Sequence, residues 1–233
     1  MGETASYWAG GRANVSNRFA SAFWYVPQLG YLASQGYLAH IRQDLAGGDY
    51  GLLDLVLDPS TGAVVDFVAN PDYFVHALWQ RLVAGVALGV SAAGAGNSSG
   101  GSSAGLRAWG GCAAREAGGA SGGVVFVIVN FDAADAAVTL ALEGASLPET
   151  RAEYVLTAGQ PALGLASPTV ALNGRVLAVG AADSALPPLP ARVAGAREAL
   201  VVPAQSVAFV ALPGARAPAC LQEEGGGQRV KKV

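Results

Sequence analysis

Charge is scarce in this sequence. Only 13% of its 233 residues are Asp, Glu, Lys or Arg, and the formal net charge is -3. A chain so poor in basic residues lacks the electrostatic footprint that nucleic acids or anionic membranes attract, and we expect no nucleic acid as a partner. The 52% of hydrophobic residues and the mean hydropathy of +0.37 instead predict a globular protein with ample material for a core.

Long apolar runs are missing too, which argues against a transmembrane segment. The best candidate, residues 82–96, is mostly Ala, Gly and Val and is too short. Met1 also leads into the chain without a basic and apolar leader, so we expect no signal peptide. The start Met-Gly-x-x-x-Ser does fit the N-myristoylation pattern. A lipid-anchored cytosolic protein is therefore one alternative, and it would require free thiols at Cys112 and Cys220.

Histidine and cysteine are equally rare. His40 and His76 have no partner at metal-ligand spacing such as His-Glu-x-x-His, so we expect no metal ion and no cofactor. The glycine clusters lack the strand-to-helix context of a nucleophile elbow or a phosphate-binding loop. Neither cysteine has a nearby His that would indicate a thiol nucleophile. Cys112 and Cys220 are either unrelated thiols or one disulfide pair.

The first 90 or so residues alternate between helical and extended patterns. Apolar residues at helical spacing predict an amphipathic helix over about 14–34, which Pro27 should kink or end. Residues 37–46 predict an apolar strand buried on both faces. A second helix is expected from Asn70, a capping residue followed by proline. Because strand, loop and helix form the unit of a (β/α)₈ TIM barrel, we assign residues 1–88 to the last part of such a barrel.

From about residue 88 the pattern changes to short β-runs with turns between them. The expected strands are 106–112, 124–130, 137–142, 153–157, 170–172, 176–179 and 207–212. Asn173-Gly174 is a strong two-residue hairpin signal. The fold class is thus α/β plus all-β, with a β-sandwich over 89–220 and a disordered tail over 221–233. Two Gly/Ser-rich stretches, 94–105 and 117–123, predict mobile loops.

Four segments together carry a family resemblance. They are the runs Gly2-Glu3-Thr4-Ala5-Ser6-Tyr7-Trp8-Ala9-Gly10-Gly11, Phe23–Gly30, Arg42–Asp54 and Asn70–Leu82. In order and spacing they resemble the C-terminal half of the heparanase-like glycosidases, glycoside hydrolase family 79. The resemblance covers about residues 2–220. It implies part of a retaining endo-β-glucuronidase that acts on uronic-acid-containing glycans, with an acidic polysaccharide or a proteoglycan glycan as partner.

The resemblance also implies roles for single residues. Glu3 follows the seventh barrel strand and matches the catalytic nucleophile. Retaining glycosidases need a second carboxyl group about 5 to 5.5 Å away as acid and base. That group lies in an Asn-Glu setting in the family, and no Asn-Glu pair occurs in this sequence. We therefore expect a fragment or a truncated gene product, and we expect this chain alone to be inactive or nearly so.

Substrate-binding roles follow in the same way. Trp8, Ala9 and Gly10 stand where the family has an aromatic residue and two glycines whose backbone faces a substrate carboxylate, with Ala9 departing from Gly. Gly48 and Tyr50 match a Gly-Asn-Tyr segment that contacts the same sugar acid. Asp49 replaces its Asn, and a buried acid there would repel the substrate unless it points away. Tyr50 could instead be a core aromatic residue. Arg42 and Gln43 are structural hydrogen-bonders or, for Arg42, a direct contact to the sugar acid.

Further implications concern the environment. The family ties the start of its sandwich to its C-terminus by a disulfide, and Cys112 and Cys220 match those ends. Asn14 and Asn97 head N-glycosylation sequons. Family members are extracellular, in the cell wall, lysosomal or vacuolar, or peripherally membrane-associated. The rival interpretation is a catalytically inactive fragment that serves as a carbohydrate-binding or structural β-sandwich. An upstream Asn-Glu motif would favour the enzyme.

Overall fold

The computed structural model describes residues 4–91, 105–119, 122–179 and 185–221. Its two α-helices are α1 (Ala20–Ser34) and α2 (Pro71–Leu82). Short 3-10 helices are η1 (Arg115–Ala117), η3 (Pro161–Ala166) and η4 (Pro218–Cys220). None of the helices in the described part of the chain is long and apolar enough to cross a membrane. The remaining regular structure is β-sheet.

The central element is an antiparallel sheet of eight strands. Seven strands follow the order β3-β4-β5-β12-β7-β8-β9, and the eighth strand, β10, also pairs with β7. The bounds are β3 (Val83–Leu88), β4 (Leu106–Ala113), β5 (Val124–Asn130), β7 (Thr150–Ala158), β8 (Val170–Leu172), β9 (Arg175–Val176), β10 (Arg192–Gly195) and β12 (Ser206–Leu212). Separate from it, β6 (Ala136–Val138) pairs with β11 (Leu200–Val202).

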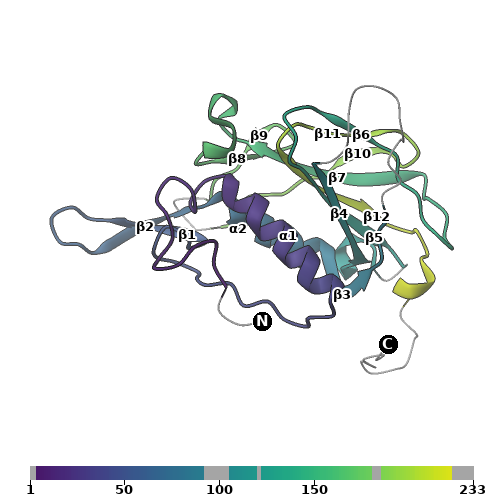
Figure 1. Ribbon diagram of the computed structural model, residues 1–233, viewed down its shortest axis with the longest axis horizontal. Helices are drawn as coiled ribbons and strands as arrows, with labels where there is room; N and C mark the ends of the chain where they lie inside the picture. The colour runs from purple at the N-terminus through teal and green to yellow at the C-terminus, as the bar shows by residue number, and fades with distance from the viewer. Residues whose placement is uncertain (1–3, 92–104, 120–121, 180–184, 222–233) are drawn as a thin grey trace.

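Buried apolar side chains alternate between the two faces of the central strands, so the sheet has a hydrophobic core on each face. On β5, Val125, Val127 and Val129 contact the helix side, whereas Ile128 contacts the opposite side. This is the period of two that a strand imposes on its side chains. Figure 1 shows α1 running across one face of the sheet. The other face is covered in part by the β6–β11 pair, through Leu200 and Val202.

Helix α1 begins later than its apolar pattern predicted. Residues 12–18 form turns, Asn14 has a left-handed φ of 60°, and Val15 is exposed, so the expected start near residue 14 is wrong. A left-handed residue cannot continue an α-helix. Pro27 lies inside α1 and does not end it. Proline removes one backbone hydrogen bond from the helix. The burial of Phe23 and Val26, which precede it in α1, offsets that loss.

The N-terminal region does not form a closed barrel within the described residues. The expected strand over 37–46 is wrong. Among the described residues its ladder contacts are two isolated parallel bridges, Thr4 with Arg42 and Ala46 with Leu53. Leu38 is 86% exposed there, because nothing in the described chain packs on it. An unexpected antiparallel hairpin follows, β1 (Leu53–Leu57) and β2 (Val64–Ala69), which projects from the body in Figure 1.

Several predictions for the C-terminal part of the chain are confirmed. Strand β5 has the expected bounds, and Asn173-Gly174 is the two-residue turn between β8 and β9. β3, β10 and β11 were not expected. β3 precedes residue 89 yet belongs to the central sheet, and both helices share a core with that sheet. The division of the chain at 88 and the β-sandwich both stay predictions. The tail over 222–233 and residues 94–104 lie outside the described residues.

Candidate functional site

The segment after Glu3 lies beside the segment that contains Arg42. Thr4 N donates to the Ile41 carbonyl at 3.0 Å, and Gln43 N donates to the Thr4 carbonyl at 2.8 Å. The Thr4 hydroxyl also donates to the Ile41 carbonyl at 2.9 Å. This parallel pairing brings together two regions that are about 40 residues apart in the chain. Glu3 itself lies outside the described residues.

Beyond this bridge, the loop at Gly10 and the loop at Gly48–Tyr50 meet backbone to backbone. The Gly10 carbonyl accepts hydrogen bonds from Asp49 N at 2.6 Å and Tyr50 N at 3.2 Å. A Cβ added at Gly48 would lie 2.5 Å from the Gly10 oxygen, and one at Gly11 would lie 2.6 Å from Tyr50 N. Only glycine permits so close an approach. The two segments assigned to sugar-acid binding are thus direct neighbours.

Backbone N–H groups at this junction are available to a ligand. Those of Ala9, Gly10 and Gly48 have no hydrogen-bond partner among the residues that the structure describes. All three residues have left-handed φ values, of 51°, 89° and 60°. Successive N–H groups in such conformations form concave sites that bind anions. Ala9 adopts the conformation that the expected glycine would favour, so its side chain does not prevent the geometry.

The side chains around the junction differ in exposure. Trp8 is 75% exposed, whereas Tyr50 is half-buried. The Asp49 carboxylate accepts a long hydrogen bond from Asn17 Nδ2, at 3.4 Å. Asn17 Nδ2 also lies 3.5 Å from Asp54 Oδ2. Asp49 is therefore held by a residue outside the two loops.

Arg42 is buried beneath the Gly48–Tyr50 loop. Its Nη2 donates to Asp72 Oδ2 at 2.8 Å and also to the Tyr50 carbonyl, and its Nη1 donates to the Gln43 carbonyl. The exposed fractions of the Arg42 and Asp72 side chains are 4% and 0%. The guanidinium carbon lies 5.2 Å from the Trp24 ring centroid. This geometry favours the structural alternative for Arg42 over a direct contact with a sugar.

The acid–base properties of this cluster follow from burial. Burial raises the pKa of Asp72 to about 6, although the Arg42 guanidinium acts in the opposite direction. Burial also raises the pKa of Tyr25 to about 12. The Tyr25 hydroxyl shares a hydrogen bond of 2.9 Å with His76 Nδ1, and burial lowers the pKa of that His76.

Sequence reasoning missed Asp72, Tyr25 and His76 as members of one cluster. The available signal was the place of Asp72 in α2. Asp72 lies three residues before Val75, which is fully buried, and so it shares the buried face of the helix. A carboxylate on such a face requires a partner. Arg42 could not be identified as that partner, because it lies 30 residues away in an irregular segment.

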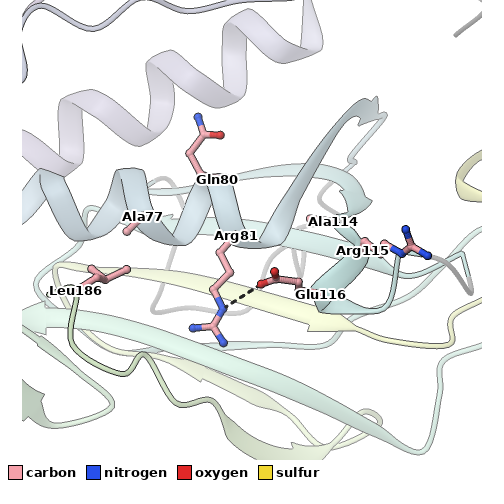
Figure 2. Close-up of a pocket in the computed structure, with 7 residues that line it drawn as sticks. All are labelled: Ala77, Gln80, Arg81, Ala114, Arg115, Glu116 and Leu186. Carbon is pink, nitrogen blue, oxygen red and sulfur yellow. Dashed lines mark ion pairs between the residues drawn. The ribbon is translucent and has the colours of Figure 1, made fainter.

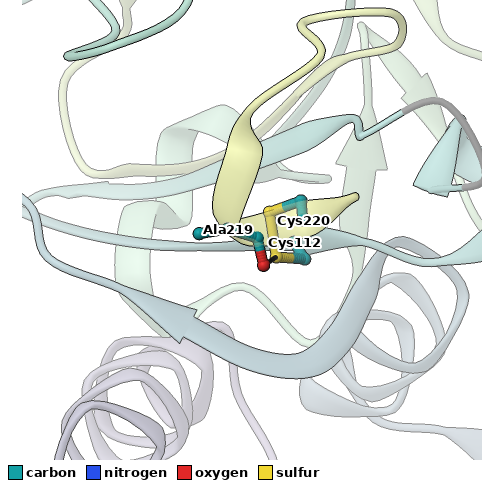
Figure 3. Close-up of a disulfide and its surroundings, with 3 residues drawn as sticks. All are labelled: Cys112, Ala219 and Cys220. Atoms are coloured by element: carbon teal, nitrogen blue, oxygen red, sulfur yellow. Dashed lines mark hydrogen bonds between the residues drawn. A yellow bond between two sulfur atoms is a disulfide. The ribbon is translucent and has the colours of Figure 1, made fainter. Parts of the chain in front are cut away.

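The remaining predicted positions lie elsewhere. Cys112 and Cys220 form a disulfide with a Cα–Cα distance of 5.3 Å, as the resemblance implied (Figure 3). Asn14 is exposed, and its Oδ1 accepts a hydrogen bond from Arg18. Asn97 lies outside the described residues. Within the described ranges, no group of three or more His, Cys, Asp or Glu residues could hold a metal ion.

An open pocket of about 490 Å³ lies between α2 and η1 (Figure 2). It is lined by Ala77, Gln80, Arg81, Ala114, Arg115, Glu116 and Leu186. Arg81 lies 4.0 Å from Glu116, and both side chains are substantially exposed. Exposed pairs of this kind contribute little energy. None of the residues at the Gly10–Gly48 junction lines this pocket.

Comparison with known proteins shows where the chain belongs. No protein-family model matches it. It is 31% identical over 215 residues to baicalin-beta-D-glucuronidase of Scutellaria baicalensis, a match that covers 92% of this chain and 36% of that enzyme. It is 28% identical to heparanase-like protein 3 of Arabidopsis thaliana, with coverages of 94% and 41%. The chain therefore spans well under half the length of these relatives.

Structural similarity agrees at the level of the fold. The GH51 arabinofuranosidase from Xanthomonas axonopodis pv. citri matches with a TM-score of 0.52 at 16% identity, over 84% of this chain and 36% of that enzyme. Similarity at this identity concerns the fold alone. The sequence matches carry the assignment, and they confirm what the motifs indicated: this chain is a relative of the heparanase-like glycosidases that corresponds to part of their length.

Proposed function

We propose that this chain is part of a retaining glycosidase that hydrolyses uronic-acid-containing glycans. The observation that carries the proposal is the junction at which Gly10 meets Gly48 and Tyr50. Its N–H groups, at Ala9, Gly10 and Gly48, have no partner among the described residues and can donate to an anion. A sugar carboxylate is an anion of suitable size, and N–H groups of this kind favour it over the uncharged hydroxymethyl group of a neutral sugar.

The substrate class rests on this junction and on the relatives. One relative is named a β-D-glucuronidase, which is an enzyme of sugar-acid glycosides. Asp49 would oppose such a substrate if its carboxylate faced the junction. The Asp49 carboxylate instead accepts a hydrogen bond from Asn17, which lies outside the junction. An acidic polysaccharide or a proteoglycan glycan is accordingly the proposed partner, and an extracellular, cell-wall or lysosomal-vacuolar location goes with it.

Glu3 is the proposed nucleophile. It directly precedes Thr4, whose backbone pairs with Ile41 and Gln43 beside the junction. In a retaining mechanism the Glu3 carboxylate attacks the anomeric carbon, and the bond to the leaving oxygen breaks as the glycosyl–enzyme ester forms. Water then attacks the ester and restores the carboxylate. Junction N–H groups would hold the sugar acid and so orient the anomeric carbon toward Glu3.

The proton donor for the leaving group has no counterpart in this sequence, which contains no Asn-Glu pair. General acid catalysis contributes about 10² to 10⁴-fold. The chain by itself should accordingly turn over natural glycosides very slowly. A leaving group that departs without a proton removes this requirement and leaves the nucleophile as the group under test.

The test uses 2-deoxy-2-fluoro-β-D-glucuronyl fluoride. Attack by Glu3 expels fluoride without protonation, and the fluorine at C2 slows hydrolysis of the ester. We expect intact-mass analysis to show one added glycosyl group, mapped by peptide sequencing to Glu3. Glu3→Gln should abolish labelling, while Glu198→Gln, at an exposed carboxylate between β10 and β11, should not. The absence of labelling in the unmodified chain, or labelling that survives in Glu3→Gln, would contradict the proposal.

A matched reagent tests the substrate class. The corresponding glucosyl fluoride has the same leaving group and lacks the carboxylate. We expect it to label at least tenfold more slowly, a difference of about 1.4 kcal/mol and within the range of one charge-assisted hydrogen bond. Equal labelling rates would leave a glycosidase without specificity for sugar acids.

A further inference from the structure

We propose that the buried Arg42–Asp72 pair is a positioning device for sugar-acid recognition, because it fixes the Gly48–Tyr50 loop against Gly10. The inference rests on the proposed function, and it assigns to that site two residues that do not contact the substrate. Arg42 acts through the Tyr50 carbonyl, and Asp72 acts through Arg42.

The first step is the geometry of the loop. The Tyr50 backbone is held on both sides: its N–H donates to the Gly10 carbonyl, and its carbonyl accepts from Arg42 Nη2. The next residue is held as well, because Asn70 Nδ2 donates to the Gly51 carbonyl at 2.9 Å. Gly47 and Gly48, by contrast, have positive φ and no Cβ. The loop therefore joins a flexible glycine pair to an anchored end.

The second step is the immobility of Arg42. Five contacts surround its guanidinium: Asp72 from α2 and the Tyr50 carbonyl at Nη2, the Gln43 carbonyl at Nη1, and the Trp24 and Tyr25 rings from α1. A planar guanidinium donates in fixed directions, so partners at two of its nitrogens determine where it can lie. Asp72 is fully buried and provides the charged partner. The Tyr50 carbonyl is consequently set by both helices.

The third step links this anchor to recognition. Gly48 N, which has no partner within the described part of the chain, lies two residues before the Tyr50 carbonyl that accepts from Arg42. A displacement of about 1 Å at a binding group is enough to weaken a recognition site substantially. Loss of the Arg42 anchor should therefore reduce preference for a sugar acid while affecting neutral sugars less. A purely structural ion pair would lower stability and leave this preference unchanged.

The experiment compares Arg42→Lys and Asp72→Asn with the control Arg151→Lys. Arg151 is also a buried arginine, 2% exposed, that pairs with a carboxylate (Glu153) and donates to several carbonyls, but it lies in the central sheet. Amide hydrogen exchange is measured by NMR at Asp49 and Tyr50, well below the unfolding temperature of each variant. We expect exchange at least about tenfold faster in Arg42→Lys and Asp72→Asn, and unchanged in Arg151→Lys.

Affinity provides the second measurement. Methyl β-D-glucuronide and methyl β-D-glucoside are titrated against each folded protein. The ratio of their affinities should fall toward one in Arg42→Lys and Asp72→Asn, and Arg151→Lys should keep the ratio of the unmodified chain. Unchanged exchange at Asp49 and Tyr50 in both site variants would overturn the positioning inference.

The two measurements separate the two proposals. If the unmodified chain binds both sugars equally, the proposed function fails. Exchange at Asp49 and Tyr50 then still decides whether Arg42 and Asp72 position the loop. If the glucuronide is preferred and the ratio survives in Arg42→Lys, the function stands and the positioning role is wrong.

Discussion

Asp72 is a carboxylate without access to solvent in the first turn of α2. Its neighbours Arg42 and Ser21 both favour the charged form, and Asp72 in turn contributes to the raised pKa of Tyr25. Burial outweighs Arg42, so the pKa of Asp72 rises from 3.8 to about 6. The folded state then binds a proton more tightly than the unfolded state does. This stabilising contribution is complete below pH 3.8 and is lost as the pH rises through 6.

Asp72→Asn should remove this pH dependence. Urea unfolding of both proteins between pH 4 and pH 7 gives the free energy of unfolding of the unmodified chain relative to the variant. We expect the stability of the unmodified chain relative to the variant to fall by about 2.4 kcal/mol between pH 4 and pH 7, because the pKa of Asp72 is about 6 in the folded state and 3.8 in the unfolded state. A constant difference, or one that grows with pH, would show that Arg42 outweighs burial.

At the scale of elements, the packing of α1 on the sheet depends on Gly30. A Cβ at this position would lie 2.3 Å from Cγ of Trp109 on β4. Alanine would improve helix propensity by about 0.5 to 1 kcal/mol, but overpacking costs about 1 to 3 kcal/mol. We expect Gly30→Ala to lower the free energy of unfolding by about 1 to 2 kcal/mol in urea titrations. In a Trp109→Leu background the same change should be neutral or stabilising, and a stabilising effect in the unmodified chain would contradict the contact.

Elements with local signals were predictable, and those held by distant partners were not. β5 is a continuous apolar run. Asn173-Gly174 specifies the turn between β8 and β9, because both residues readily adopt left-handed φ values. β10 has no apolar pattern, because it is held by pairing with β7 and by the contact of Arg192 with buried Glu153. The apolar run over 37–46 misled for the opposite reason: its composition suits a buried strand, while its surroundings leave Leu38 exposed.

The candidate site divides in the same way. Gly10, Gly48 and Tyr50 could be located from motif order, since their spacing along the chain is a local property. Their contact, which leaves N–H groups without a partner among the described residues, lies beside the pairing of Thr4 with Ile41 and Gln43. Neither glycine identifies its partner in the sequence.

At the scale of the molecule, the two ends of the chain are constrained differently. The disulfide Cys112–Cys220 has a sequence separation of 108 and encloses β5 through β12, most of the central sheet (Figure 3). Both helices lie before Cys112 and pack on the sheet through Phe23, Phe74 and Leu78. Helix α2 also continues directly into β3, and its Leu82 carbonyl accepts a hydrogen bond from Ala114 N at 2.7 Å, but no disulfide holds either helix. The sheet should therefore be the more robust part, and the junction at Gly10–Gly48 the less robust.

Removal of the disulfide tests this distribution. In the chain-entropy model, opening a loop of this length lowers the free energy of unfolding by about 4 to 5 kcal/mol. We expect a Cys112→Ser/Cys220→Ser variant to show that loss in urea titrations, and we expect dithiothreitol to produce the same loss in the unmodified chain and none in the variant. Because the disulfide acts on the unfolded state, amide exchange at Asp49 and Tyr50 through local opening should not change. Faster local exchange there in the double variant would show instead that the disulfide shapes the folded junction.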